Sequence, residues 1–354
     1  MSTKQIESRK EDHIRICLEE PVDSVNRTGL SDFLLEYDAL PEIDLDDVDL
    51  ECEILGKKLS APLMIGAITG GTDRAARINA NLARAAEELG IGLCLGSQRA
   101  MIEDPGSAES FDVRKLCPSI PLVLGNMGAV QLKLGVTAEM INKGLSTLEM
   151  DGLLFHINPL QEAVQPEGDT QFKALSEKMG EVCSRLEFPC LVKEVGTGIS
   201  PRTADKLAAL PLDGVETAGM GGTSWTLVET FRSGDSAKGW AGRDLVSFGV
   251  STARSIISCR RAFSDRLVIG SGGIRTGYDA AAAIALGADA VALAKPVLGA
   301  ALESHESVKR ILETIIQGLK LTMFGCGVQT TAELKRVRFL KIPAWATSLN
   351  NRLA

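Results

Sequence analysis

The hydrophobic positions of this chain fall into short apolar runs that alternate with longer segments of helical period. Eight of the runs are rich in Leu, Ile, Val or Ala at both odd and even positions. That pattern predicts strands of a parallel sheet that is covered on both faces. The predicted strands are Leu63–Ile68, Ile91–Gly96, Leu122–Asn126, Gly152–His156, Cys190–Val195, Gly214–Ala218, Leu267–Ser271 and Ala290–Ala294.

Segments of helical composition separate these runs. Clear examples are Ala75–Leu89, Thr137–Leu148, Ser247–Phe263 and Tyr278–Leu286, the last followed by Gly287 as a C-terminal cap. Eight strand-then-helix units predict an α/β fold, a (β/α)8 TIM barrel with an N-terminal extension. The alternative is a doubly wound open sheet, which usually carries a Gly-rich dinucleotide loop after its first strand. The segment Thr69-Gly70-Gly71-Thr72 does not fit that loop.

The pattern divides the chain into three parts. Residues 1–60 form an N-terminal arm and barrel lead-in, residues 61–340 the barrel, and residues 341–354 a C-terminal tail. Within the arm, Leu40–Asp49 is acidic, as a solvated connection would be. The cluster Arg9-Lys10-Glu11-Asp12-His13 has the residue types of a disordered polar terminus. The alternative is a basic arm that closes over an anionic substrate.

Composition and charge narrow the function classes. The net charge of −8 argues against a nucleic-acid or anionic-membrane surface. The eight cysteines form no Cys-x-x-Cys pair, which excludes a zinc ribbon or a thioredoxin-type motif. The polar first residues lack the apolar core of a signal peptide, and no apolar run approaches the ~18 residues of a membrane span. We therefore expect a cytoplasmic protein without membrane insertion.

In a (β/α)8 barrel the active site lies at the C-terminal ends of the strands. The seventh strand ends in Gly272-Gly273-Ile274-Arg275 and the eighth in Ala294-Lys295, which predicts a phosphate site built from backbone N–H groups and nearby cations. An ordinary tight turn is the alternative. Lys193 ends an otherwise apolar strand, where it either meets an anion, such as the edge of a reduced flavin, or snorkels to the rim. Glycine pairs at three strand ends leave room for a planar cofactor, and together these features favour FMN.

The fourth strand runs into His156-Ile157-Asn158-Pro159-Leu160-Gln161-Glu162. Arg99 and His156 could hold an anion there, with Ser97 donating a hydrogen bond. Glu162 is a hard oxygen ligand suited to Mg²⁺, which binds through one or two carboxylates and substrate phosphates. The alternatives are a solvated loop carboxylate for Glu162 and a satisfied buried histidine for His156.

These motifs together resemble the type 2 isopentenyl-diphosphate isomerases, from residue 9 to about residue 335. The matching blocks are Arg9-Lys10-x-x-His13-Ile14, Thr69-Gly70-Gly71, Gly96-Ser97-Gln98-Arg99, Asn126-x-Gly128-Ala129-Val130-Gln131-Leu132, His156-x-Asn158-Pro159-Leu160-Gln161-Glu162, Glu167-Gly168-Asp169, Lys193-Glu194-Val195-Gly196, Gly221-Gly222-Thr223-Ser224-Trp225 and Ser271-Gly272-Gly273-Ile274-Arg275. The chain departs from the family's usual residues at Ile68, Glu216, Ala218, Ala282 and Phe248–Thr252.

The resemblance implies an FMN-containing barrel that interconverts isopentenyl and dimethylallyl diphosphates, with Mg²⁺ and with flavin reduced by NADPH or NADH. It also implies a homotetramer or homo-octamer. The implied FMN contacts are Ala67, Ile68, Thr69, Ser97, Asn126, Lys193, Thr223, Gly273, Ile274, Arg275, Ala294 and Lys295. The implied substrate contacts are Arg9, Lys10, His13, Ser97, Arg99, His156, Asn158 and Gln161, with Glu162 as the metal ligand.

The catalytic residues implied by the resemblance are Gln161, His156 and Lys193. Reduced FMN would move the proton, Lys193 would tune the charge of the ring, and Gln161 would orient the substrate or pass a proton. The first competing hypothesis is an FMN-dependent 2-hydroxy-acid oxidase or dehydrogenase, which needs a histidine base after the sixth strand. The segment Ala218-Gly219-Met220-Gly221-Gly222 has none. The second is a binding scaffold whose active site has lapsed.

Overall fold

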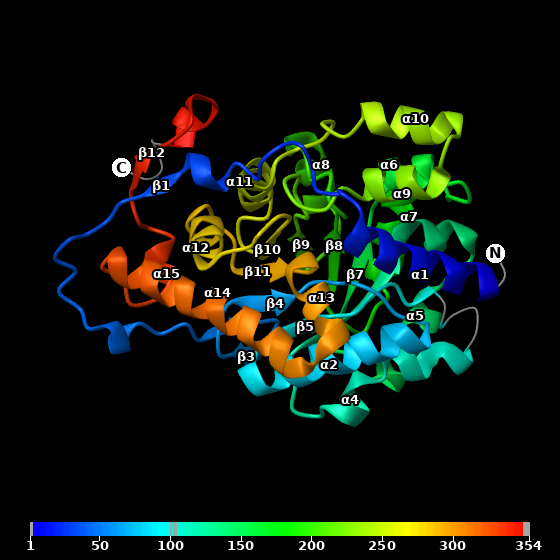
Figure 1. The fold of residues 1–354 in the computed structure, drawn as a ribbon, viewed down its shortest axis with the longest axis horizontal. Coiled ribbons are helices and arrows are strands. Elements are labelled where there is room, and N and C mark those ends of the chain that lie inside the picture. The colour runs from blue at the N-terminus through cyan, green and yellow to red at the C-terminus, as the bar shows by residue number, and fades with distance from the viewer. Residues whose placement is uncertain (1–2, 100, 102–104, 350–354) are drawn as a thin grey trace.

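Eight parallel strands form a closed barrel at the centre of the molecule (Figure 1). The computed structural model describes residues 3–99, 101 and 105–349. The barrel strands are β4 Leu63–Ile65, β5 Gly92–Cys94, β6 Val123–Gly128, β7 Gly152–His156, β8 Cys190–Lys193, β9 Gly214–Glu216, β10 Leu267–Ser271 and β11 Ala290–Leu293. They pair in chain order, and β11 closes the ring on β4. The predicted TIM barrel is confirmed.

Several strands are shorter than predicted because their last residues leave the sheet to line its mouth. The segment Gly66–Ile68 follows β4 as coil, and all three of its residues border the central cavity. The strand β6 instead runs two residues beyond the predicted end at Asn126. Its last residues pair with Phe155 and His156 of β7, which holds that histidine at the rim.

Helices surround the barrel. They are α2 Asp73–Leu89, α4 Val113–Leu116, α5 Ala138–Thr147, α6 Pro159–Val164, α7 Leu175–Cys183, α8 Pro201–Ala208, α9 Trp225–Ser233, α10 Ala237–Asp244, α11 Thr252–Ala262, α12 Gly277–Ala285, α13 Lys295–Glu303, α14 His305–Gly325 and α15 Thr331–Leu334. The predicted helix over 247–263 begins only at Thr252, after Ser251 in extended conformation. The hydroxyl of Thr276 and the carboxylate of Asp279 form a capping box that starts α12.

The core has two parts. One lies between the barrel and its helices, and the other fills the barrel interior with side chains such as Met64, Leu124 and Leu191. The residues before the barrel contribute to the second part through a hairpin of β2 Cys52–Ile54 and β3 Lys57–Leu59. Ile54 and Leu59 belong to the interior cluster, so the lead-in is structural and not only a connection.

The N-terminal arm is ordered, and the disordered alternative is wrong for its described residues. Residues Thr3–Glu19 form helix α1, which packs against α9 and α13 beside the barrel mouth (Figure 1). Its residues Lys10, Ile14 and Cys17 are buried and share one face, at the spacing of successive helical turns. Burial of that face, together with the buried Ile16, stabilises a helix whose sequence is largely polar.

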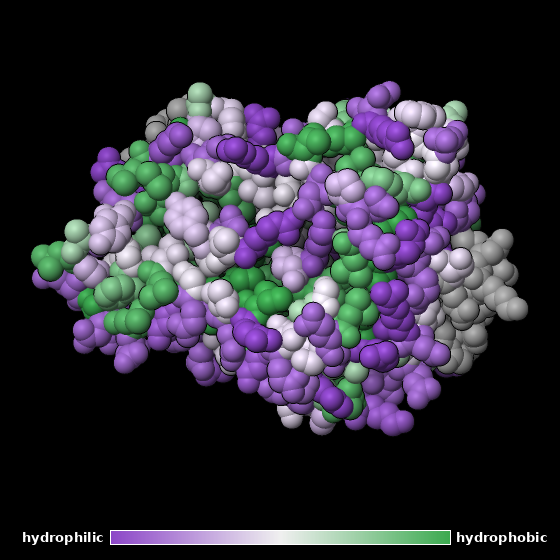
Figure 2. Space-filling model, viewed as in Figure 1, coloured by the Kyte–Doolittle hydropathy of each residue, from purple (hydrophilic) through white to green (hydrophobic). Residues whose placement is uncertain are grey.

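A segment that follows α1 pairs with one near the C-terminus, away from this helix (Figure 1). The strand β1 Leu34–Leu35 pairs antiparallel with β12 Phe339–Lys341, and a 3₁₀ helix, η5 Ala344–Leu349, follows. Residues 350–354 of the predicted tail lie outside the described residues. Polar side chains cover most of the face shown in Figure 2. Among the described residues, no helix is long and apolar enough to cross a membrane.

Candidate active site

One cavity at the C-terminal ends of the strands brings the predicted site residues together. Every residue expected to contact cofactor, substrate or metal lines it: Arg9, Lys10, His13, Ala67, Ile68, Thr69, Ser97, Arg99, Asn126, His156, Asn158, Gln161, Glu162, Lys193, Thr223, Gly273, Ile274, Arg275, Ala294 and Lys295. They come from α1 and from segments that follow the barrel strands. Because they are spread over the whole chain, only the closed barrel could place them around one space.

Glycines crowd the backbone at the predicted phosphate site. Gly272 and Gly273 have φ angles of 105° and 72°, in the region that side chains rarely adopt. A Cβ atom on Gly272 would lie 2.0 Å from the carbonyl oxygen of Gly219, and one on Gly222 would lie 2.5 Å from the nitrogen of Gly273. No side chain caps the N-terminus of α13 at Ala294. Bare backbone beside an uncapped helix start fits a phosphate group.

An acidic residue lies beside this site, which sequence reasoning did not predict. Asp23 Oδ1 accepts hydrogen bonds from Arg275 (3.2 Å) and from Lys295 Nζ (2.8 Å). A backbone bridge between Asp23 and Thr223 holds the acid there. Burial acts to raise the pKa of Asp23, but Lys295 and Arg275 outweigh it and keep that pKa below its usual value. The two cations are therefore shared with Asp23, and backbone N–H groups remain for the phosphate.

Lys193 lies at the floor of the cavity. It is only 7% exposed, which excludes the alternative that it snorkels to the rim. Its ammonium donates a hydrogen bond of 2.6 Å to the carbonyl oxygen of Glu194 and lies 3.4 Å from Glu216 Oε1. A buried ammonium with one nearby carboxylate can still contact an electron-rich group bound in the cavity, as the flavin hypothesis requires.

A second buried carboxylate fixes the loop after Lys193. Glu194 Oε2 accepts hydrogen bonds from four successive backbone N–H groups, those of residues 195–198, at 2.5–2.9 Å. Burial raises the pKa of Glu194, and the same backbone hydrogen bonds oppose that rise. The loop borders the cavity through Val195 and Gly196, so this contact shapes the wall beside Lys193.

His156 is a neutral group in this site. Its Nδ1 lies 2.8 Å from Asn126 Oδ1, so the ring donates to that amide and directs Nε2 elsewhere. Burial, with smaller effects from Lys193 and Arg9, lowers the pKa of His156 to about 3. His156 was expected to help hold an anion, but a neutral ring adds no positive charge and could contact an anion only through a hydrogen bond.

The segment after His156 forms a short polar helix start. Asn158 precedes α6, and its Nδ2 donates to Gln161 Oε1 (3.0 Å) and to Glu162 Oε1 (3.1 Å). The backbone N–H of Asp169 donates to Glu162 Oε2 at 2.7 Å. Glu162 is only 9% exposed, and burial raises its pKa, so the alternative of a solvated loop carboxylate is wrong.

The chemistry of this donor set fits a magnesium ion held mainly by its substrate. The described residues contain no group of three or more His, Cys, Asp or Glu side chains that could hold a metal ion by themselves. Mg²⁺ is commonly bound by one or two carboxylates together with substrate phosphates and water. A single buried carboxylate at Glu162, close to the basic residues of the mouth, matches that mode.

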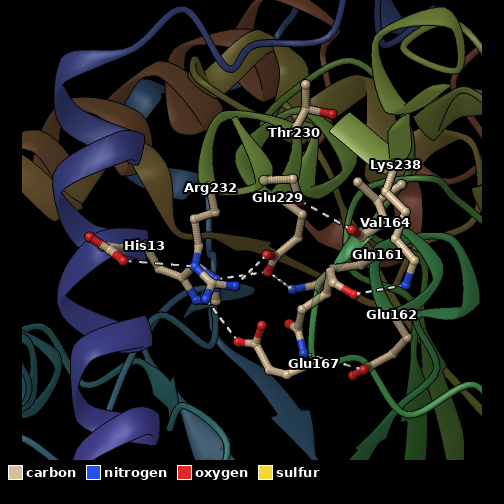
Figure 3. A network of polar contacts seen from close by, with 12 residues as sticks. His13, Gln161, Glu162, Val164, Glu167, Glu229, Thr230, Arg232 and Lys238 are labelled. Atoms are coloured by element: carbon tan, nitrogen blue, oxygen red, sulfur yellow. Dashed lines mark hydrogen bonds and ion pairs between the residues drawn. The ribbon is translucent and has the colours of Figure 1, made fainter. Parts of the chain in front are cut away.

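Glu229 is the main site residue that sequence reasoning missed (Figure 3). It lies on α9, is fully buried, and its Oε1 accepts hydrogen bonds from His13 Nε2 (2.8 Å) and Gln161 Nε2 (3.2 Å). Arg232 donates to Oε2 at 2.7 Å. Burial acts to raise the pKa of Glu229, but His13 and Arg232 hold it below its usual value. The available signal was its place one helical turn after Trp225, which belongs to one of the family motifs and borders the cavity.

Helix α1 closes one side of the cavity within the same chain. Lys10 Nζ donates to the carbonyl oxygens of Gly70 and, at 3.5 Å, of Ser97. Burial lowers the pKa of Arg9, although Glu167 and Glu229 act against it. The arm therefore supplies basic side chains to the cavity of its own chain. This placement agrees with the alternative that the arm is a basic segment lying over an anion-binding site.

Acids of the chain already pair with other cations at the mouth. Arg99 forms a 2.8 Å ion pair with Asp169, and Arg232 one of 2.8 Å with Glu167. To form ion pairs with Arg99 or Arg232, a diphosphate that enters the site would have to displace the carboxylate of Asp169 or Glu167.

Comparison with known proteins decides the family. Residues 140–340 match the model of the FMN-dependent dehydrogenase family. The isopentenyl-diphosphate delta-isomerase of Nostoc sp. strain PCC 7120 is 43% identical over 94% of this chain and 95% of its own length. The chain belongs to the FMN-dependent isopentenyl-diphosphate delta-isomerases. The enzyme of the same name from Oceanobacillus iheyensis is 42% identical over 96% of this chain and 97% of its own length.

Solved structures that resemble this isomerase-family barrel support its fold. Mandelate oxidase with (S)-2-phenylpropionate has a TM-score of 0.66 and 18% identity, covering 96% of this chain and 98% of that one. A lactate oxidase from Pediococcus acidilactici gives a TM-score of 0.62 and 16% identity, covering 95% and 94%. At this identity the likeness concerns the fold alone. The described residues after β9, from Ala218 to Gly222, contain no histidine to act as a hydroxy-acid base.

Proposed function

We propose that this protein interconverts isopentenyl and dimethylallyl diphosphates with reduced FMN, and that it uses Mg²⁺ and NADPH or NADH. The observation that carries the proposal is the hydrogen-bonded group of Asn158, Gln161 and Glu229 at the mouth of an FMN-type barrel. The relatives named isopentenyl-diphosphate delta-isomerase support the same conclusion.

Movement of the double bond needs a proton added at one carbon and another removed nearby. Positive charge develops on the substrate, so a strong nucleophile in contact with it would be alkylated. A cysteine that lines the cavity is kept inactive: burial raises the pKa of Cys17 to about 11, so this thiol stays protonated. Reduced FMN, when bound, supplies an electron-rich ring and an exchangeable proton.

Gln161 is the side chain that we place beside the reacting carbons. Its oxygen accepts from Asn158 and its nitrogen donates to Glu229, so the amide cannot rotate freely. A fixed amide dipole beside a developing cation orients the substrate without becoming alkylated. Glu229 stays ionised, which strengthens the hydrogen bond that holds Gln161.

Basic residues of the mouth would bind the diphosphate. Arg9, Lys10 and Arg99 line the cavity on the side where α1 meets the barrel. Glu162 would supply the protein's carboxylate ligand to Mg²⁺, which would neutralise part of the charge of the diphosphate. His156 would then contact the substrate as a neutral hydrogen-bonding group. Lys193, at the floor, would contact the flavin ring and influence its charge.

An isotope-exchange experiment tests this function. Protein with reduced FMN, Mg²⁺ and isopentenyl diphosphate in deuterated water should form dimethylallyl diphosphate and incorporate deuterium. Gln161→Asn shortens the amide by one methylene, which should lower kcat by about 100-fold if it loses its place beside the reacting carbons. Gln317→Asn, on the exposed surface of α14, is the matched control and should leave kcat unchanged.

Two results would contradict the proposal. One is unchanged turnover in Gln161→Asn, which would remove the assigned role of that amide. The other is isomerisation by protein that contains no flavin. Bleaching of the flavin by lactate or mandelate would instead favour the oxidase alternative.

The predicted homotetramer or homo-octamer and the cytoplasmic location remain predictions. Light scattering coupled to gel filtration measures the first directly. Helix α1 lines the cavity of its own chain through Arg9, Lys10 and His13.

A further inference from the structure

A buried carboxylate at the floor of the cavity has an oxygen without a partner. Glu216 is the last residue of β9, and its Cα is paired with Lys193 on one side and with Ile269 on the other. It is 3% exposed and borders the central cavity. No catalytic, substrate or metal role above uses this residue.

The two oxygens of Glu216 have different surroundings. Oε1 accepts a 2.9 Å hydrogen bond from the hydroxyl of Ser271 and lies 3.4 Å from Lys193 Nζ. Oε2 is buried and has no hydrogen-bond partner among the described residues. A buried carboxylate oxygen left without a donor is unfavourable, so a donor from a bound group would relieve that penalty.

The position of Glu216 selects the part of FMN that can supply this donor. Ser271, which holds Oε1, directly precedes Gly272 and Gly273 of the phosphate site. On the other side, Lys193 is the residue expected at the flavin ring. Glu216 therefore lies between the places assigned to the phosphate and to the ring. The ribityl chain joins these two parts of FMN, and its hydroxyl groups can donate.

We propose that Glu216 binds a ribityl hydroxyl of FMN through Oε2. This inference rests on the proposed use of FMN. The phosphate and the ring carbonyl oxygens are acceptors and cannot serve a carboxylate, which leaves the ribityl hydroxyls and the N–H groups of the ring, N3–H and, in reduced FMN, N5–H. The hydroxyls are favoured because Glu216 is held from the phosphate side, by the residue adjoining Gly272.

Flavin analogues separate the ribityl contact from every other effect of a substitution. FMN and riboflavin both carry the ribityl chain, whereas lumiflavin has only a methyl group there and retains N3–H. The apoprotein and its Glu216→Leu variant are titrated with each flavin, and binding is followed by quenching of flavin fluorescence. A hydrogen bond to a charged group contributes about 1.5–3 kcal/mol, or roughly 10- to 100-fold in affinity.

Glu216→Leu should weaken FMN and riboflavin by roughly 10- to 100-fold and lumiflavin by less than about threefold. Equal losses for the three flavins would overturn the proposal, because they would assign the effect to the ring or to Lys193. Unchanged affinities would overturn it as well. Glu216→Gln keeps the shape of the side chain and should weaken the three flavins in the same order, by smaller factors. If circular dichroism shows that the leucine variant does not fold, the glutamine variant provides the test in its place.

Failure of this inference is distinguishable from failure of the proposed function. A wild-type protein that binds none of the three flavins would contradict the use of FMN altogether. Tight binding of FMN by the wild type, with equal losses in the variant, would leave the isomerase proposal intact and remove only the role of Glu216.

Discussion

Asp23 is the residue whose charge works against a bound phosphate. Its carboxylate bonds both cations nearest the phosphate site, Arg275 and Lys295. Asp23→Asn removes that negative charge, so FMN should bind more tightly, by roughly 3- to 10-fold for an exposed pair near 1 kcal/mol. Riboflavin, which has no phosphate, should bind as it does to the wild type. Flavin fluorescence titrations measure both.

The exposed Asp46→Asn is the control for net charge and should leave both affinities unchanged. The gain for Asp23→Asn should shrink at high salt, because salt screens exposed charges. Weaker FMN binding in this variant would contradict the argument and show that Asp23 orients the two cations instead of competing with the phosphate.

Residues at strand ends could be predicted from the barrel pattern, and those on α1 and α6 from the family motifs, whereas two carboxylates outside both patterns could not. Lys193 and His156 end apolar strands, and the barrel rule alone places them at the mouth. Glu229 and Asp23 lie on a helix and in the arm, where a carboxylate is ordinary. Only tertiary packing shows that the first contacts Gln161 and the second contacts Lys295. The neutral state of His156 also depends on its burial, which no local pattern reveals.

Among the elements, α1 differs most from its prediction. Its residue types suggested disorder, yet the helix is held to the barrel by side chains on several faces. His13 bonds Glu229 on α9, and Glu11 accepts from Thr72 at 2.9 Å and lies 3.3 Å from Arg74. An isolated helix of this length is marginal in water, so these contacts and the buried face decide its order.

Glu11 provides a way to loosen α1 without altering the cavity lining. Glu11→Ala removes the contacts to Thr72 and Arg74, while Lys10 and His13 stay unchanged in sequence. The KM for isopentenyl diphosphate should rise several-fold, since Arg9 and Lys10 would spend less time in place. The affinity for FMN should change little. Steady-state kinetics and flavin titration measure the two effects.

Glu19→Ala, at the exposed end of the same helix, is the matched control and should behave as the wild type. Hydrogen exchange gives an independent measure: residues of α1 should exchange faster in Glu11→Ala than in the control. An unchanged KM together with faster exchange would show that α1 does not contribute to binding the diphosphate.

At the scale of the whole molecule, the barrel was predictable because its signal repeats eight times. Each buried strand is a separate apolar run, so an error in the boundary of one strand does not change the number of strands predicted. The hairpin of β2 and β3 was not predicted, because its strands are three residues long and its sequence is partly charged. Its role at the barrel interior depends on Ile54 and Leu59 meeting side chains far along the chain.

His156 should make the stability of the whole molecule depend on pH. Its pKa is lowered from 6.5 to about 3 in the folded protein, so below pH 6.5 the unfolded chain binds a proton that the folded chain does not. Stability from the neutral ring is full above pH 6.5 and is lost as the pH falls toward 3. The slope contributed by this residue approaches about 1.4 kcal/mol per pH unit between those values. Urea unfolding of wild type and His156→Gln at pH 8.5, 7.5, 5.5 and 4.5 measures it.

The variant should lose less stability on acidification than the wild type. Above pH 7.5, where His156 is neutral in both the folded and the unfolded chain, the free energy of unfolding should change with pH equally in the two proteins. That second comparison is the internal control, because a general loss of packing in the variant shifts its stability without changing its slope. Equal slopes below pH 6 would mean that His156 is protonated in the folded protein. A charged imidazolium would then be available to the diphosphate, and the neutral role given to this residue would be wrong.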